Sequence, residues 1–274
     1  MTHADRPPTA LADRPLPVPD ALRPWITEAD SVTAGDRPAE PLTHAPDTAT
    51  KLVVRAERDG RRDALVVGPR TRASYHSADG KHVVSCVRMS LAPGTARPLL
   101  GVPAADLVGR VVPLRDLPAE AARRLSYEIT DREPDELVAR LTEVLPTLLP
   151  ASGAARSRQQ LLRAAVDALS VRTGRVPGQV KAVAQELAVS ERQLRNLFTE
   201  GVGLSPKHYA RIDRVRAVLA HATTVSWAEL AVAAGYYDQS HMSADFRALM
   251  GVPPRSFVTG RLPGPRPCQA IDRR

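Results

Sequence analysis

Cysteine and aromatic residues are scarce in this 274-residue chain, and it has no long apolar run. Its two cysteines, Cys86 and Cys268, are far apart in the sequence, which excludes a disulfide framework or a thiolate zinc site within one chain. We therefore expect a reducing compartment. No stretch reaches the roughly 20 apolar residues that a membrane span needs, and the first residues lack the apolar core of a secretion signal. We expect a cytoplasmic protein with no membrane contact.

Sequence patterns for catalysis are also missing. No Gly-rich phosphate loop follows a predicted strand, and no serine stands in the strand-turn-helix arrangement of a hydrolase nucleophile. Aromatic residues make up only 4% of the chain, so its core must be largely aliphatic. We expect no enzyme activity, no cofactor and no metal ion.

The chain has a net positive charge, and the excess of Lys and Arg lies entirely in the C-terminal half. Residues 151–274 contain 18 Lys and Arg against 9 Asp and Glu, whereas residues 1–150 contain 20 against 21. A basic half joined to a neutral half suggests a module that binds a polyanion next to a module with another task. A solvated basic face would have the same composition, and the motifs below favour the first reading.

Composition and periodicity predict an α+β protein with two domains. Short β-type runs over 51–56, 64–68 and 82–91 are separated by the turn dipeptides Asp59-Gly60 and Asp79-Gly80. Helical periodicity follows, and Pro146 and Pro150 are expected to end it. The predicted segments are a disordered tail over 1–19, a β-rich sensor or dimerisation domain over 20–115, a helical linker over 116–156, an all-helical DNA-binding domain over 157–262 and a flexible tail over 263–274.

Two helix-turn-helix patterns occur in the helical domain. In residues 180–198, the small Ala184 lets two helices approach closely, and Ala188 and Val189 form the turn. Residues 227–246 repeat the pattern with a turn about one residue longer. Each pattern predicts two helices joined by a tight turn, and the basic charge around them predicts double-stranded DNA as the partner.

The second helix of each pattern carries the candidate DNA-binding residues. Ser190 is expected to begin the first of these helices with a capping box to Gln193, and Asp238 is expected to cap the second. Ser226 is expected to form another capping box with Glu229 at the start of the second pattern. Arg pairs with guanine, Asn with adenine, and Glu accepts from cytosine. The second helix offers fewer such side chains, and Asp245 adds negative charge, so we expect the first unit to read bases and the second to set orientation. The candidates are Ser190, Glu191, Arg192, Arg195, Asn196, Gln239, Ser240, His241 and Arg247.

The segment GYYDQSHMSADFRALMGVPPRSF (235–257), which follows LAVSERQLRNLF, resembles the AraC/XylS family of bacterial transcription regulators. The resemblance covers about 160–260. It implies that the two motifs, joined by one long helix, enter successive major grooves, and that the protein activates transcription by contacting RNA polymerase. It also implies base-reading positions. These are Arg192, Arg195 and Asn196 in the first motif, and Gln239, Ser240 and Ala244 in the second, where Ala244 replaces a commonly basic residue.

Residues 45–55, 66–76 and 97–103 are similar to the cupin-like β sensor regions of some actinobacterial members. This similarity implies effector sensing or dimerisation. A metal site is not implied, because the histidines at 44, 76 and 82 lack the close His-x-His spacing with a carboxylate.

Three functions stay open at this point. The first is an effector-responsive activator, in which a small molecule or a second copy of the chain biases DNA binding. The second is a constitutive DNA-binding protein whose N-terminal domain only dimerises. The third is an alkyl-transfer repair fusion, which two isolated cysteines cannot support.

Overall fold

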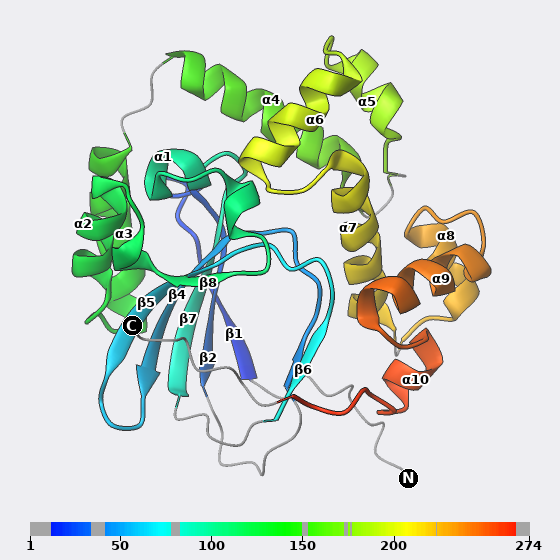
Figure 1. Cartoon of the computed structure of the whole chain (residues 1–274), viewed down its shortest axis with the longest axis horizontal. Coiled ribbons are helices and arrows are strands. Elements are labelled where there is room, and N and C mark those ends of the chain that lie inside the picture. Colours follow the sequence, from blue (N-terminus) through cyan, green and yellow to red (C-terminus); the bar gives the residue numbers. More distant parts are fainter. Residues whose placement is uncertain are drawn as a thin grey trace.

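The chain has a β-rich N-terminal part followed by a helical C-terminal part (Figure 1). The structure is a computed structural model. Its order of strands and helices confirms the predicted α+β class. The residues that it describes are 12–33, 42–77, 83–149, 153–172, 175, 177–222 and 224–266.

The N-terminal part is built on a six-stranded antiparallel sheet with the order β1-β2-β7-β4-β5-β8. The three predicted strands are confirmed as β4, β5 and β7, and Asp59-Gly60 closes the β4–β5 hairpin with Gly60 at φ 83°. The second predicted turn, Asp79-Gly80, lies outside the described residues. The strands are β1 Ala12–Leu16, β2 Ile26–Thr33, β4 Lys51–Glu57, β5 Arg62–Val67, β7 Val83–Leu91 and β8 Val111–Pro113.

Both chain ends depart from the predicted tails. Residues 12–16, expected to be disordered, form the edge strand β1 against β2, where Pro15 is tolerated because an edge strand has one unpaired side. At the other end, the Arg266 amide donates to the Tyr75 carbonyl at 2.9 Å, and its carbonyl accepts from the Ser77 amide at 3.0 Å. Residues 1–11 and 267–274, with Cys268, lie outside the described residues.

A small second sheet pairs β3 Leu42–His44 with β6 Ser74–His76. This β3–β6 ribbon lies beside the helical part of the chain in Figure 1. Arg266 pairs with β6 of this ribbon through a parallel bridge to His76. The ribbon therefore connects the two parts of the molecule.

Short helices cover the large sheet and share its core. The segment 116–156, predicted to be a linker, instead contributes buried Leu125, Ile129 and Leu141 to the same cluster as the sheet. Pro146 does not end the helix, since it lies in the last turn, where its missing N–H removes a single hydrogen bond. The helices are α1 Ala96–Leu100, the 3-10 turns η1 Ala104–Leu107 and η2 Leu114–Asp116, α2 Glu120–Ile129 and α3 Pro134–Leu148.

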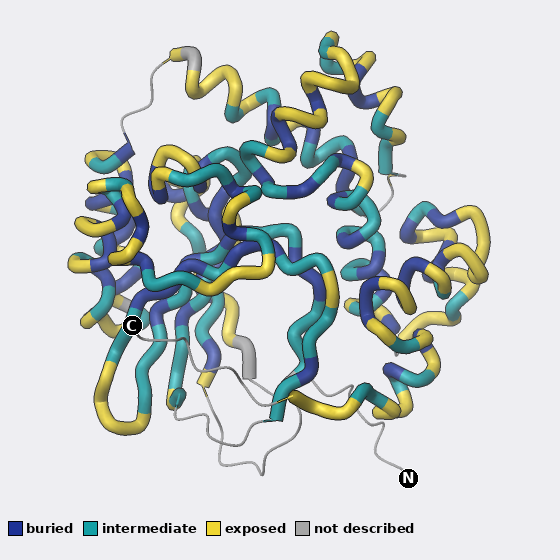
Figure 2. Tube along the Cα trace, viewed as in Figure 1, coloured by how far each residue is buried: buried dark blue, intermediate teal, exposed yellow. Residues whose placement is uncertain are grey.

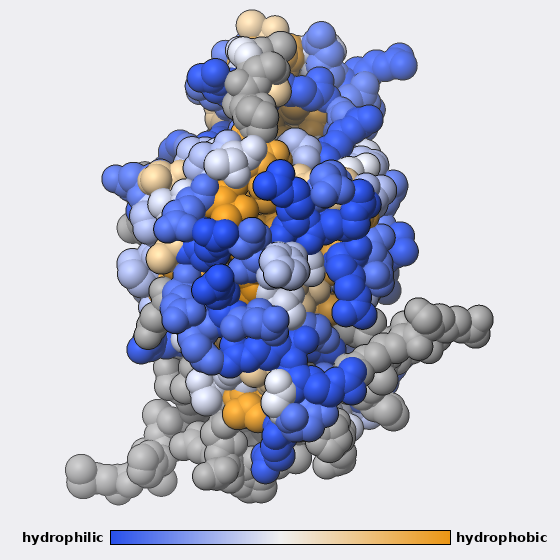
Figure 3. Space-filling view, turned by 90° about the vertical axis from the view of Figure 1, so that its left-hand side faces the viewer, coloured by the Kyte–Doolittle hydropathy of each residue, from blue (hydrophilic) through white to orange (hydrophobic). Residues whose placement is uncertain are grey.

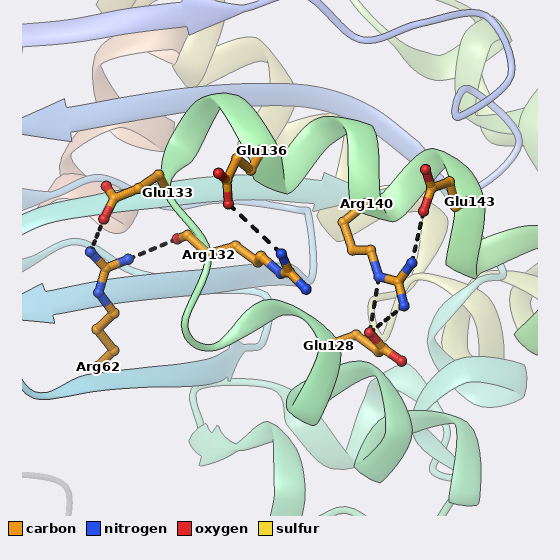
Figure 4. A network of polar contacts seen from close by, with 7 residues as sticks. All are labelled: Arg62, Glu128, Arg132, Glu133, Glu136, Arg140 and Glu143. Atoms are coloured by element: carbon orange, nitrogen blue, oxygen red, sulfur yellow. Dashed lines mark hydrogen bonds and ion pairs between the residues drawn. The ribbon is translucent and has the colours of Figure 1, made fainter.

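Charged pairs fix α2 and α3 to each other and to the sheet (Figure 4). Arg140 of α3 donates to Glu128 of α2 at 2.6 Å and to Glu143 at 2.7 Å. Arg62 of β5 pairs with Glu133, which precedes α3. The outer face of these helices is mostly hydrophilic (Figure 3), as expected of a face in contact with water.

The helical part has a second core of its own. Phe198, Ile212 and Phe246 are fully buried in it, and Figure 2 shows the exposed outer sides of its helices. The first helix begins at Gly153, inside the segment predicted as a linker. The helices are α4 Gly153–Leu169, α5 Val180–Glu186, α6 Glu191–Gly201, α7 Pro206–His221, α8 Trp227–Ala233, α9 Gln239–Met250 and α10 Pro254–Val258. Among the described residues, none of these helices is apolar over enough length to cross a bilayer.

Candidate nucleic-acid interface

The first helix-turn-helix unit consists of α5, α6 and the turn between them. The Val189 amide donates to the Ala184 carbonyl at 3.0 Å, and Ala188 takes a left-handed φ of 53°, which is uncommon for a residue other than Gly. The Ser190 hydroxyl accepts from the Gln193 amide at 3.1 Å, while the Gln193 side chain accepts from the Ser190 amide at 2.8 Å. The predicted capping box is confirmed.

Helix α6 has an apolar inner side and a polar outer side. Leu194 and Phe198 are fully buried. Positions three and four residues apart share a helix face, so Arg192, Arg195 and Asn196 point the same way. The first unit's candidates are all exposed, namely Ser190, Glu191, Arg192, Arg195 and Asn196.

Arg192 and Arg195 differ from several other arginines because they have no ion-pair partner within the described part of the chain. Elsewhere a guanidinium group is held by a carboxylate, as Arg88 is by Asp30 at 2.6 Å. The donors of the two α6 arginines are therefore available to a phosphate or to a guanine edge.

The second unit consists of α8 and α9 and repeats the first with one more residue in the turn. Its turn is closed by the Tyr236 amide, which donates to the Ala231 carbonyl at 2.8 Å. Gly235 takes the left-handed conformation at φ 74°. Asp238 begins α9, and its carboxylate accepts from the His241 amide at 2.7 Å, so the predicted cap is confirmed. The second unit's candidates are also exposed, namely Gln239, Ser240, His241 and Arg247.

Asp245 corrects one expectation from the sequence. We expected its charge to weaken the DNA-facing side of α9, but the side chain is buried and faces α7. Its Oδ1 lies 2.8 Å from Arg211 Nη2 and 3.0 Å from Arg211 Nε. The carboxylate is therefore neutralised inside the domain, and Ala244 alone marks the thinner reading surface of the second unit.

Helix α7 holds the two units in place. Ser205 caps it through the His208 amide. Near its C-terminal half, the Arg214 guanidinium lies 4.9 Å from the centre of the Tyr236 ring, which also contacts the His241 ring edge-on at 5.3 Å. Burial, with Asp245 nearby, raises the pKa of the Tyr236 hydroxyl and keeps it protonated. Tyr236 therefore serves the packing between α7 and the second unit.

The structure also exposes side chains that the sequence analysis missed. Tyr237, in the turn two residues before α9, is 93% exposed, and Val232 of α8 is 74% exposed. Large apolar side chains this exposed are informative when they lie beside a binding surface. The signal in the sequence was the extra residue in the second turn, since this leaves Tyr237 without the packing position that Tyr236 occupies.

The candidate residues form two separate sets, with α7 between their helices (Figure 1). Each set is continuous along its own helix. No group of three or more His, Cys, Asp or Glu suited to a metal ion occurs among the described residues.

Comparisons with known proteins agree with this geometry. A family model described as "Helix-turn-helix domain" matches residues 183–260, and the curated proteins gave no match.

Three solved structures are among those that the fold is similar to. An AraC-type transcriptional regulator from Chromobacterium violaceum shares 25% identity over 39% of this chain and 96% of its own, with a TM-score of 0.33. The C-terminal domain of AraT from Geobacillus stearothermophilus shares 22% identity over 43% and 92%, with a TM-score of 0.31. ToxT from Vibrio cholerae shares 9% identity over 86% and 98%, with a TM-score of 0.40.

The matched residues include the second motif, all of the first motif after residue 182, and the turns of both. The C-terminal part of the chain is therefore a helix-turn-helix domain, and this domain supports a DNA-binding transcriptional regulator.

Proposed function

We propose that this protein is a transcription regulator that recognises a specific DNA sequence, chiefly through α6. One observation carries the proposal: Arg192, Arg195 and Asn196 are exposed on one face of a capped helix, and both arginines lack an ion-pair partner in the described part of the chain. Each can make a bidentate contact with a base edge in the major groove. The free amides at the N-terminus of α6 are suited to a backbone phosphate.

The second unit sets the register of the first on the duplex. Helix α7 has 16 residues, about 24 Å at the rise of an α-helix. We propose that α6 and α9 enter successive major grooves about 34 Å apart. Ser240, His241 and Arg247 then contact phosphates, whose recognition carries position rather than sequence.

The N-terminal part makes this binding responsive to a small effector, in an activator that contacts RNA polymerase and forms a homodimer. A cavity between the two parts, described below, supports the effector. The polymerase contact and the dimer follow from the family resemblance, and the cupin-like character of the N-terminal part stays a prediction. The alternative is a constitutive DNA-binding protein whose N-terminal part only dimerises. A finding that no ligand changes the DNA affinity would support this alternative.

The test is footprinting of the full chain on its host's genomic DNA, followed by affinity measurements on the recovered sites. We expect specific sites bound at least about 1,000-fold more tightly than random duplex. The Arg192→Ala, Arg195→Ala double variant should lose that preference while keeping weak binding to any DNA. Unchanged footprints in the double variant would contradict the role given to α6.

A further inference from the structure

A cavity of about 290 Å³ lies where the β-rich part meets the helical part. One side is formed by the loop 47–50 and by the end of β7 at 90–93. The other side is formed by the ends of α4 and α6 and by α7. This volume is near the lower end for small-molecule sites. The cavity is therefore large enough for a small metabolite, and its walls come from both parts of the chain.

The walls are held together by polar contacts across the boundary. Asp47 is buried and bound by Lys51 at 2.6 Å and by Arg216 of α7 at 3.1 Å. Although burial raises the pKa of Asp47, these two cations hold it below its usual value. The Tyr209 hydroxyl lies 2.8 Å from the Ser170 hydroxyl. Burial raises the pKa of Tyr209 to about 12. The cavity is preformed and rich in hydroxyl groups.

Two carboxylates of this lining, Glu28 and Asp213, lack an ion pair among the described residues. Glu28 is exposed, whereas Asp213 of α7 is half-buried. Its Oδ2 accepts from the Val171 amide at 2.7 Å. The guanidinium groups closest to the cavity are already engaged, since Arg172 pairs with Asp167 at 2.7 Å and Arg216 with Asp47. Burial raises the pKa of Asp213, and the nearby arginines offset this only in part. A carboxylate in this setting is stabilised by a cation that enters the cavity.

We propose that this cavity is the effector site and that it takes a small organic amine, with the ammonium group on Asp213 and its remaining polar atoms on the surrounding hydroxyls. This inference rests on the proposed function, because it names the effector of that regulator. Gly201 and Val202, at the end of the recognition helix α6, also line the cavity. A ligand in the cavity therefore contacts both α6 and the β-rich part. Its binding stabilises one position of the first helix-turn-helix unit relative to the β-rich part.

The experiment measures thermal unfolding of the full chain with a panel of primary amines, among them ethanolamine, putrescine, agmatine and tyramine. Each amine is paired with a neutral alcohol and with a carboxylate of similar size. We expect at least one amine to raise Tm by several degrees and to do so saturably, as a ligand of the native state must. Its alcohol and carboxylate counterparts should have no such effect.

Two variants separate charge from space. Asp213→Asn keeps the shape of the side chain and should lower amine affinity at least 10-fold. Ala49→Met enlarges a lining residue while leaving Asp213 in place, and it should also reduce binding. Asp106→Asn, at an exposed position in η1 outside the lining, is the matched control and should bind like the parent chain.

Three results would overturn the proposal: no amine raises Tm, the alcohols or carboxylates act as well as the amines, or Asp213→Asn responds like the parent chain. Because DNA is absent from these measurements, their failure leaves DNA recognition intact. Conversely, amine binding by a chain that shows no sequence preference on DNA would reject the proposed function and keep the site.

Discussion

The two helix-turn-helix units bury the same positions of their recognition helices, but at one of these positions the second unit has a charged residue where the first has an apolar one. Leu194 and Phe198 of the first unit correspond to Met242 and Phe246 of the second, and all four are fully buried. Between them, the buried Leu197 of the first unit corresponds to Asp245 of the second. The first recognition helix is thus held by apolar packing, whereas the second also depends on an ion pair to Arg211 of α7.

The units also differ in how they attach to the β-rich part. The end of the first recognition helix meets the loop after β7, where the Gly94 amide donates to the Gly201 carbonyl at 2.9 Å, and Arg97 pairs with Glu200. The second is attached to the β3–β6 ribbon, where the Tyr75 hydroxyl donates to the Met250 carbonyl at 2.7 Å. The two units of one domain therefore contact different segments of the β-rich part.

The largest effect is expected from Asp245→Leu, which gives the second unit the residue of the first. Arg211 would lose its partner in a mostly buried place, and this should destabilise the docking of α9 by about 3 kcal/mol. Hydrogen exchange of the α9 amides, compared with those of α6, measures the local loss. Adding Arg211→Leu removes the stranded charge and should restore most of the stability. Equal exchange in the single and double variants would show that the pair is not what holds α9.

The next effect concerns DNA. Arg192→Ala and Arg195→Ala should each weaken binding to the specific site by about 1 to 3 kcal/mol, with relaxed preference at the base pair contacted. Gln239→Ala of the second unit should cost less than about 1 kcal/mol. Titration of labelled duplexes at fixed salt measures all three, and Arg115→Ala, whose side chain is 71% exposed in the β-rich part, is the control. Equal losses in both units would remove the proposed difference between them.

Tyr237→Ala should have a smaller effect that is uniform across DNA sequences. A phosphate contact by its exposed hydroxyl is worth about 1 kcal/mol, and it carries no base preference. Tyr127 of α2 is 87% exposed and far from both recognition helices in the sequence, so Tyr127→Ala is the matched control. A loss confined to one sequence would instead make Tyr237 a base reader.

The smallest effect is expected at the turns. Ala188→Gly removes a left-handed strain of about 1 kcal/mol but adds chain entropy to the unfolded state, leaving a gain of about 0.5 kcal/mol. Gly235→Ala in the second turn should lower the free energy of unfolding by a similar amount. Urea unfolding measures both changes. If both substitutions destabilise the chain, the left-handed strain of Ala188 is smaller than the entropy that Gly adds.

Local patterns were sufficient to predict much of the helical part. The capping boxes at Ser190 and Ser226 and the cap at Asp238 depend on residues three positions apart, and the structure has all of them. The inward side of α6 follows from helical spacing in the same way. Strands β4, β5 and β7 were predicted because apolar residues and turn dipeptides mark them.

Contacts between distant residues could not be predicted in this way. Asp245 looks like a surface charge in the sequence, because its partner Arg211 is 34 positions away. The polar strand β2 (ITEADSVT) carries a weak β pattern and is fixed by pairing with β1 and β7. The cavity likewise depends on Asp47 and Asp213, which no local pattern connects.

The pairing of Arg266 with β6 has a consequence for how the chain folds during synthesis. The contact between Tyr75 and Met250 spans 175 residues, and closing so long a loop makes these contacts slow to form. Until residue 266 has been synthesised, the outer edge of β6 has no partner strand. An unpaired strand edge is a site at which chains aggregate, so a residue that is synthesised long after β6 protects the edge of this strand.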